Sequence, residues 1–124
     1  MVVDTSAVLA VFFAEPHGAW AAAQMKTHAR ELRMSTVNLA ETLVLLRDRQ
    51  PTLADELEER LLTSGIRFVP PDVHQARIAA DARLRLPLNF GDCFAYALAV
   101  TTRTALLAVD ADFRAVDTAV VLPP

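Results

Sequence analysis

The chain has 124 residues, of which 53% are hydrophobic and 22% charged, so it can bury a core and wholesale disorder is excluded. A net charge of −3 does not by itself suggest a nucleic-acid-binding protein, and a single cysteine excludes an internal disulfide. Apolar runs such as Ala7–Ala14 and Cys93–Val100 are much shorter than the roughly 18 residues of a membrane span. No basic segment precedes the first apolar stretch, so we expect one cytoplasmic domain over residues 1–124.

In the first half of the chain, short apolar segments alternate with longer helical patterns. Pro16 is predicted in the first turn of a helix, and Pro51 and Gly65 are expected just after the ends of two others. In chain order, the predicted elements are a strand Met1–Val3, a helix Ser6–Ala14, a helix from Pro16 to about Arg30, a weak strand Arg33–Ser35, and helices Asn38–Arg49 and Thr52–Thr63.

The second half repeats the alternation and decides the fold class. In chain order, we predict a strand Ile66–Val69, a helix from the cap Asp72 to about Arg85, a loop Pro87–Gly91, a helix Cys93–Thr102 opened by Asp92, a strand Ala105–Val109, a turn Asp110–Phe113 and a strand Ala119–Leu122. Continuous apolar strands between helices indicate an α/β fold with a mainly parallel sheet, covered by helices on both faces.

Several acidic residues lie at predicted strand ends or helix starts, where the functional edge of a parallel sheet is found. They are Asp4, Glu41, Asp92, Asp110 and Asp112. Each has a structural explanation: Asp4 and Asp92 as helix N-caps, Glu41 in a capping box with Asn38, and the last two as turn residues.

Convergence of these acids favours a second explanation. Clustered carboxylates repel one another, and no lysine, histidine or cysteine near them offers another way to offset the repulsion. A divalent ion bound by hard oxygen ligands resolves the repulsion, which favours Mg²⁺ or Mn²⁺. The natural use of such a site is metal-assisted phosphate chemistry.

Four segments carry a resemblance that spans the chain: VVDTSAVLA at the start, STVNLAET in the middle, NFGDCFAYALA near residue 92 and LLAVDADF near residue 110. Together they resemble VapC-type toxins, the PIN-domain ribonucleases of bacterial type II toxin–antitoxin pairs. The resemblance implies a PIN-like three-layer α/β/α sandwich and a Mg²⁺-dependent endoribonuclease, with Mn²⁺ as an alternative ion. It also implies an RNA substrate, a homodimer and a VapB-like antitoxin as partner.

Site residues follow from the same resemblance. Asp4 and Asp92 are implied to be the principal metal ligands, and Glu41 to complete the acidic pocket directly or through water. The fourth acid is either Asp110 or Asp112, because relatives differ in its position before the phenylalanine. The hydroxyl residues after the first aspartate, Thr5 and Ser6, are expected to orient a ligand or a phosphate.

Basic residues and apolar helices supply the remaining expectations. Outside the five acids, basic residues outnumber acidic ones, and several arginines are candidates to hold phosphates around the pocket: Arg77, Arg83, Arg85, Arg103 and Arg114. The positive mean hydropathy of +0.29 indicates a spare apolar face for a partner. In the resembled family, the region of the helices within Ser6–Arg30 and Asn38–Thr63 contributes to the dimer and receives the antitoxin.

Other readings of the acids are weaker. A hydrolase with an aspartyl nucleophile needs a second aspartate where Ser6 stands, and a receiver domain needs a late lysine, whereas Lys26 is the only lysine. The alternative that stays open is a PIN-like module that binds RNA or protein without cutting it. DNA is a less favoured substrate, since no visible residue pattern reads the 2′-hydroxyl.

Overall fold

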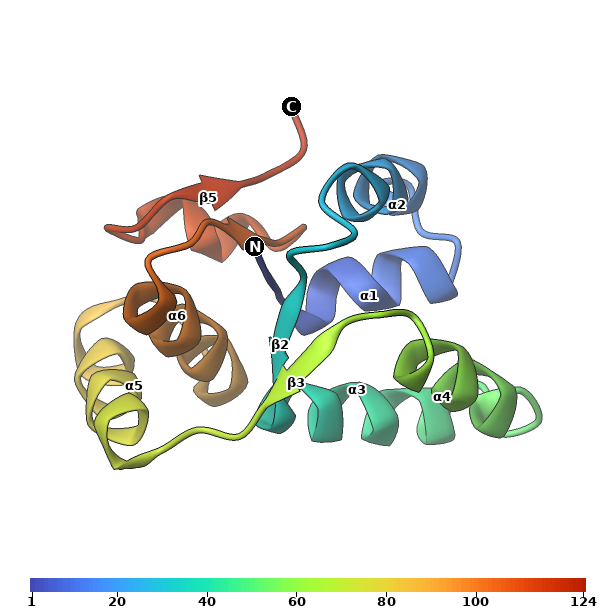
Figure 1. Cartoon of the computed structure of the whole chain (residues 1–124), viewed down its shortest axis with the longest axis horizontal. Helices are drawn as coiled ribbons and strands as arrows, with labels where there is room; N and C mark the ends of the chain where they lie inside the picture. Colours follow the sequence, from blue (N-terminus) through green and yellow to red (C-terminus); the bar gives the residue numbers. More distant parts are fainter.

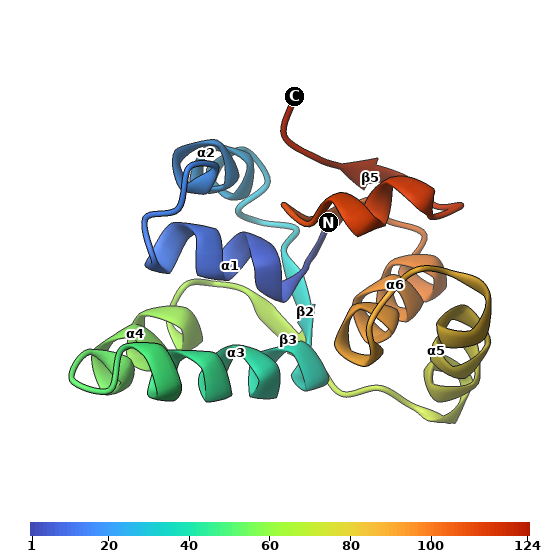
Figure 2. The same ribbon diagram turned by 180° about the vertical axis from the view of Figure 1, so that it is seen from behind.

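Five short strands form one parallel sheet through the middle of the molecule, with helices on both of its faces (Figures 1 and 2). The computed structural model describes residues 1–124. The strands are β1 (Val2–Val3), β2 (Arg33–Ser35), β3 (Arg67–Val69), β4 (Leu106–Leu107) and β5 (Val120–Val121), in the spatial order β3-β2-β1-β4-β5. Every neighbouring pair is parallel, so the predicted α/β fold with a parallel sheet is confirmed.

Two helical layers enclose the sheet. The two views agree that the helices of the first half of the chain lie on one side of it and those of the second half on the other (Figures 1 and 2). The larger layer holds α1 (Thr5–Phe12), α2 (Gly18–Thr27), α3 (Thr36–Arg49) and α4 (Ala54–Leu62), and the smaller holds α5 (Val73–Arg85) and α6 (Phe90–Thr102). A short 3-10 helix, η1 (Ala111–Ala115), joins β4 to β5. None of these helices combines the length and apolar character needed to cross a bilayer.

The strands divide the core in two because successive side chains point to opposite faces of a sheet. Val2 and Leu106 pack with α5 and α6, whereas Val3 and Leu107 pack with α1, α2 and α4. All four of these side chains are fully buried at 0% exposure. Both faces of the central strands are therefore apolar, which explains why the strands read as uninterrupted hydrophobic runs.

The start of α2 differs from the prediction. The helix begins at Gly18 rather than at Pro16. The amide of Gly18 donates to the carbonyl of Glu15 at 2.9 Å, so Pro16 occupies a tight turn in front of the helix. Proline favours this second position of a turn as strongly as it favours a first helical turn, and the sequence alone does not separate the two.

The starts of α3 and α6 also differ, and these differences bear on the acids. The N-cap of α3 is Ser35, whose hydroxyl accepts from the amide of Val37 at 3.3 Å, so the proposed capping box of Asn38 and Glu41 is wrong. The N-cap of α6 is Asn89, so Asp92 is the third helical residue rather than the residue before the helix. The predicted loop Pro87–Gly91 is correspondingly shorter, since the better cap lies upstream of Asp92.

Two other ends behave as predicted. Gly65, after α4, has a φ of +89°, a left-handed conformation that glycine adopts without strain. Asp72 caps α5, with its carboxylate accepting from the amide of Gln75 at 2.8 Å. The turn predicted after Asp110 is tightened into η1, which Asp110 caps.

Candidate active site

Four acids from separate parts of the chain line one pocket of about 150 Å³. Asp4 follows β1, Glu41 lies in α3, Asp92 in the first turn of α6, and Asp110 follows β4. The chain runs from β1 outward to β3 and then returns to β4 on the other side of β1. Such a reversal opens a crevice at the carboxyl ends of the strands, and Asp4 and Asp110 border this crevice.

Asp4 is the most deeply buried of these acids, with 1% exposure. It caps α1, and its Oδ2 accepts from the amide of Ser6 at 3.0 Å. Its Oδ1 is buried without any hydrogen-bond partner. Burial raises the pKa of Asp4 to about 6, although the contacts with Ser6 oppose the shift. An unpaired buried carboxylate oxygen is costly, and this one is available to a ligand.

Asp92 is also buried, at 4% exposure. Its Oδ2 accepts from the amide of Asn89 at 3.3 Å, while Asn89 accepts from the amide of Asp92 at 2.8 Å, which completes a capping box. Burial, followed by the charge of Asp4, raises the pKa of Asp92 to about 7. Asp92 is therefore both a structural helix-start residue and a member of the acidic pocket.

Glu41 reaches the pocket by lying directly over Gly91 of α6. A Cβ added at Gly91 would overlap the carboxylate of Glu41, so no other residue fits there while Glu41 keeps its place. Glycine at position 91 therefore allows the first turn of α6 to approach α3 closely.

The structure distinguishes between the two candidates for the fourth acid. Asp110 lines the pocket, whereas Asp112 is exposed and does not line it. The amide of Asp112 donates to Oδ1 of Asp110 at 2.9 Å, which makes Asp112 part of the turn that holds Asp110. Of the five acids predicted to converge, four do so and Asp112 does not.

The two hydroxyl residues after Asp4 connect segments of the chain. The hydroxyl of Thr5 donates to the carbonyl of Asn38 at 3.2 Å. Oγ of Ser6 accepts from the amide of Val109 at 3.0 Å and from that of Asp110 at 3.4 Å. These bonds attach α1 to α3 on one side and to the segment after β4 on the other, a role that sequence reasoning did not assign.

Comparisons with known proteins identify the family of the chain. Residues 1–119 match the family model of the PIN domain. A "Ribonuclease VapC" of Mycolicibacterium smegmatis is 36% identical, over 98% of this chain and 99% of that protein. The chain belongs to the VapC ribonucleases of the PIN domain family.

Solved structures show the same fold. VapC20 of Mycobacterium tuberculosis, described as a toxin that cleaves the sarcin–ricin loop, has a TM-score of 0.83 at 22% identity, with 98% of each chain covered. A toxin–antitoxin complex from Klebsiella pneumoniae has a TM-score of 0.74 at 19% identity, over 97% of this chain and 94% of that one. The PIN-like three-layer sandwich is thus confirmed.

No basic residue lines the acidic pocket of this PIN domain. The arginines expected to hold phosphates around it are all exposed and lie elsewhere: Arg77, Arg83, Arg85, Arg103 and Arg114. Arg85 is held by Asp81 and Asp117, and together with Arg77 it borders a different hollow, between α5 and α6. None of these arginines therefore lines the pocket itself, and their contact with RNA phosphates around it stays a prediction.

The donor set of the pocket fits a hard divalent cation. It offers carboxylate oxygens without a competing cation, and one of them, Oδ1 of Asp4, is buried and unpaired. No three His, Cys, Asp or Glu side chains are gathered closely enough to coordinate an ion as they stand. The residue types and their burial therefore fit a metal, although the side chains are not gathered around one position.

Sequence reasoning missed the contacts of three residues in this PIN domain: Asn38, Asn89 and Gly91. Asn89 stands three residues before Asp92, a spacing typical of a capping box and visible in the sequence. The sequence suggests Asn38 as a cap for its own helix, whereas its side-chain amide donates to a carbonyl of α6. No local signal reveals that contact, because it joins residues 53 positions apart.

Proposed function

We propose that this chain is an endoribonuclease toxin that hydrolyses RNA phosphodiester bonds in the acidic pocket with Mg²⁺, or alternatively Mn²⁺, as cofactor. One PIN domain over residues 1–124 carries the whole site and acts in the cytoplasm, where RNA is available. The observation that carries the proposal is the convergence of Asp4, Glu41, Asp92 and Asp110 in a pocket with no basic residue.

The buried acids would hold the ion. Asp4 and Asp92 are the principal ligands in this proposal, because both are buried and each is anchored through Oδ2 by a backbone amide. Anchoring through one oxygen fixes the carboxylate and leaves the other oxygen for the ion. Glu41 and Asp110 complete the negative pocket, directly or through water. Asp112 acts only through the turn that it forms with Asp110.

The ion and the residues of the protein have separate roles in this proposal. When bound, Mg²⁺ would supply a Lewis acid that polarises a phosphoryl oxygen and makes water a better nucleophile near neutral pH. The acids hold the ion and fix its position at the ends of the parallel strands, and no basic side chain in the pocket lining competes with it. We expect water to attack phosphorus, with no covalent enzyme intermediate.

A VapB-like antitoxin is the proposed regulatory partner. An apolar hollow of about 130 Å³ lies between α1, α2 and α4 and suits the apolar face of a partner helix. It is lined mainly by Val8, Val11, Phe12, Met25, Leu61 and Ile66. An arginine of the antitoxin placed against the carboxylates would then block the pocket by charge complementarity. Co-expression with a short neighbouring reading frame should give a complex that does not cleave RNA, whereas a complex that still cleaves RNA would contradict this arrangement.

A homodimer is the proposed oligomeric state, since α3 and α4 carry exposed apolar side chains. Val44 is 64% exposed and Leu62 is 48% exposed. Light scattering on the purified chain should give twice the monomer mass of 13.6 kDa, and a monomer at all concentrations would exclude the dimer.

The decisive experiment separates an enzyme from a binding module. Purified protein is incubated with total cellular RNA in Mg²⁺, in Mn²⁺ and with EDTA, and the products are followed by gel electrophoresis and end-group analysis. We expect cleavage with either ion and none with EDTA. RNA binding without cleavage under all conditions would support the inactive PIN-like module instead. The Asp4→Asn protein serves as control for a contaminating nuclease.

A further inference from the structure

Asn38 lies where three segments that carry the acids meet. It belongs to α3, one turn before Glu41, and it is fully buried at 0% exposure. Its side-chain amide donates to the carbonyl of Gly91 at 2.9 Å. Its backbone carbonyl accepts from the hydroxyls of Thr5 at 3.2 Å and Thr42 at 2.7 Å. One residue thus contacts the neighbour of Asp4 and the neighbour of Asp92.

The contact with Gly91 sets the position of two acids relative to one another. Asn38 and Glu41 are three residues apart and therefore project from the same face of α3. The carbonyl of Gly91 accepts a hydrogen bond from the side-chain amide of Asn38, and Gly91 lies directly beneath the carboxylate of Glu41. Because Gly91 immediately precedes Asp92, fixing its carbonyl fixes the first turn of α6, and with it the position of Asp92 relative to Glu41.

Stability alone does not account for an amide at this position. The Oδ1 of Asn38 is buried without a partner, and an unpaired buried polar atom is unfavourable. An apolar residue of similar size would fill the same space without that cost. A buried polar group that is only partly satisfied calls for a specific role, and the role visible here is the bridge from α3 to α6.

We propose that Asn38 is a positioning residue, whose amide bridge to Gly91 sets the spacing of Glu41 and Asp92 for binding the divalent ion. This inference rests on the function proposed above. It concerns a group that touches neither the ion nor the RNA. Removing a residue that orients metal ligands without touching the metal typically lowers metal affinity or activity by about 10- to 100-fold.

The test compares Asn38→Leu with the matched control Thr42→Val. The first substitution removes the bridge to Gly91 and keeps a side chain that branches at the same carbon. The second removes a buried hydrogen bond to the same Asn38 carbonyl, in the same helix, but leaves the bridge to α6 intact. Mn²⁺ binding to each purified protein, without RNA, is measured by electron paramagnetic resonance, and thermal midpoints report the fold.

We expect the dissociation constant for Mn²⁺ to rise by about 10- to 100-fold in Asn38→Leu. In Thr42→Val it should change by less than about threefold, even where both thermal midpoints fall equally. If Asn38→Leu does not fold, Asn38→Ser, which cannot span the distance to Gly91, carries the same expectation.

Two results would overturn the inference alone: wild-type Mn²⁺ affinity in the folded Asn38 variant, or an equal loss of affinity in Thr42→Val. A wild-type protein that binds no Mn²⁺ and cleaves no RNA would instead overturn the proposed function, and the positioning role with it.

Discussion

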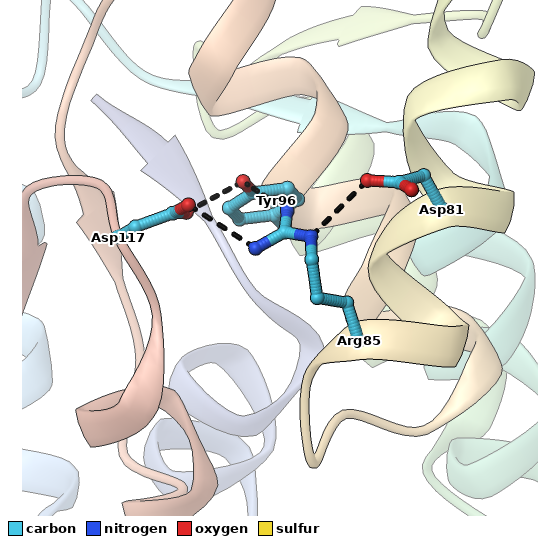
Figure 3. A network of polar contacts seen from close by, with 4 residues as sticks. All are labelled: Asp81, Arg85, Tyr96 and Asp117. Atoms are coloured by element: carbon cyan, nitrogen blue, oxygen red, sulfur yellow. Dashed lines mark hydrogen bonds and ion pairs between the residues drawn. The ribbon is translucent and has the colours of Figure 1, made fainter.

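Two groups of charged side chains in this protein are organised in opposite ways. The acidic pocket gathers four carboxylates of one sign, two of them buried, with no basic residue among them. On the α5–α6 face, Asp81, Arg85, Tyr96 and Asp117 form a network of alternating partners (Figure 3). Arg85 donates to Asp81 and to Asp117, each at 3.2 Å, and the hydroxyl of Tyr96 donates to Asp117 at 2.6 Å.

The pKa values of aspartate side chains are shifted in opposite directions in the two regions. The hydrogen bond from Tyr96, followed by smaller contributions that include the charge of Arg85, lowers the pKa of Asp117. Burial, with neighbouring carboxylates adding to it, raises the pKa values of Asp4 and Asp92. In the network each carboxylate is paired with the guanidinium of Arg85, whereas the carboxylates of the pocket have no basic partner. The network supports the fold, whereas the buried acids of the pocket lower stability and leave carboxylate oxygens free to bind a ligand.

The largest expected effect comes from replacing an aspartate by asparagine, once in the acidic pocket and once in the network. Asp92→Asn should lower RNA cleavage by more than about 100-fold, beyond the range found for residues that only support metal ligands. It should also raise the thermal midpoint of the metal-free protein at pH 8, because it removes a buried charge while its side chain still accepts from Asn89. Asp117→Asn should leave cleavage unchanged and lower the midpoint. Equal activity loss in both variants would erase the distinction between the two regions.

A second prediction uses the glycine beneath Glu41. In Gly91→Ala the new methyl group displaces the Glu41 carboxylate, so cleavage should fall by about 10-fold or more, as for other changes to the support of a metal site. Stability should change little, since alanine favours a helix by about 1 kcal/mol over glycine and the displaced group is a flexible side-chain end.

Gly65→Ala is the matched control for that substitution. A Cβ at Gly65 meets nothing within 4 Å, but its φ of +89° strains any other residue. This variant should lose stability of about 1 kcal/mol and keep full activity. Urea unfolding and cleavage assays on both glycine variants check the pair, and full activity in Gly91→Ala would show that the position of Glu41 is unimportant.

A third prediction follows from the raised pKa values. Asp4 and Asp92 titrate at about 6 and about 7 in the folded state, against 3.8 for the ordinary group, so the unfolded state binds fewer protons between these limits. The contribution of these acids is full below about pH 4 and is lost as pH rises through 6 and 7, a loss of several kcal/mol at about 1.4 kcal/mol per pKa unit. The contribution of these two acids should therefore lower the thermal midpoint in EDTA over this range.

Mg²⁺ should reverse that trend. The ion competes with protons for the same oxygens, so its stabilising effect should grow as pH rises through 6 and 7. Midpoints measured in parallel with EDTA and with Mg²⁺ should therefore diverge with increasing pH. Asp4→Asn should remove most of the divergence, and curves that stay parallel in the wild type would contradict a metal site at these acids.

The smallest effect is expected in the network. Tyr96→Phe removes the hydroxyl that bridges Arg85 and Asp117 and should lower the free energy of unfolding by about 1 kcal/mol, as for a single hydrogen bond. RNA cleavage and metal affinity should stay at wild-type values. A change in metal affinity would show that the two regions are coupled through α6, the helix that carries both Tyr96 and Asp92.

The comparison also indicates what the sequence can and cannot predict. The fold class and the four pocket acids follow from apolar strands and from acids at strand ends and near helix starts, because these local patterns can be combined with the general rule for the functional edge of parallel sheets. Helix starts are less accessible, since Ser35 and Asn89 compete with Asn38 and Asp92 as caps. The bridge from Asn38 to Gly91 and the partners of Arg85 depend on tertiary contacts, which no spacing reveals.

The place of β1 in the sheet has a consequence during synthesis of the chain. β1 is the middle strand, and its neighbour β4 is made of residues 106–107, more than a hundred positions later. A ribosome must therefore synthesise the chain beyond residue 110 before the sheet closes and Asp110 takes its place in the same pocket as Asp4. The acidic pocket is therefore assembled late in folding, because it depends on the pairing of β1 with β4, the neighbouring strands that lie farthest apart in sequence.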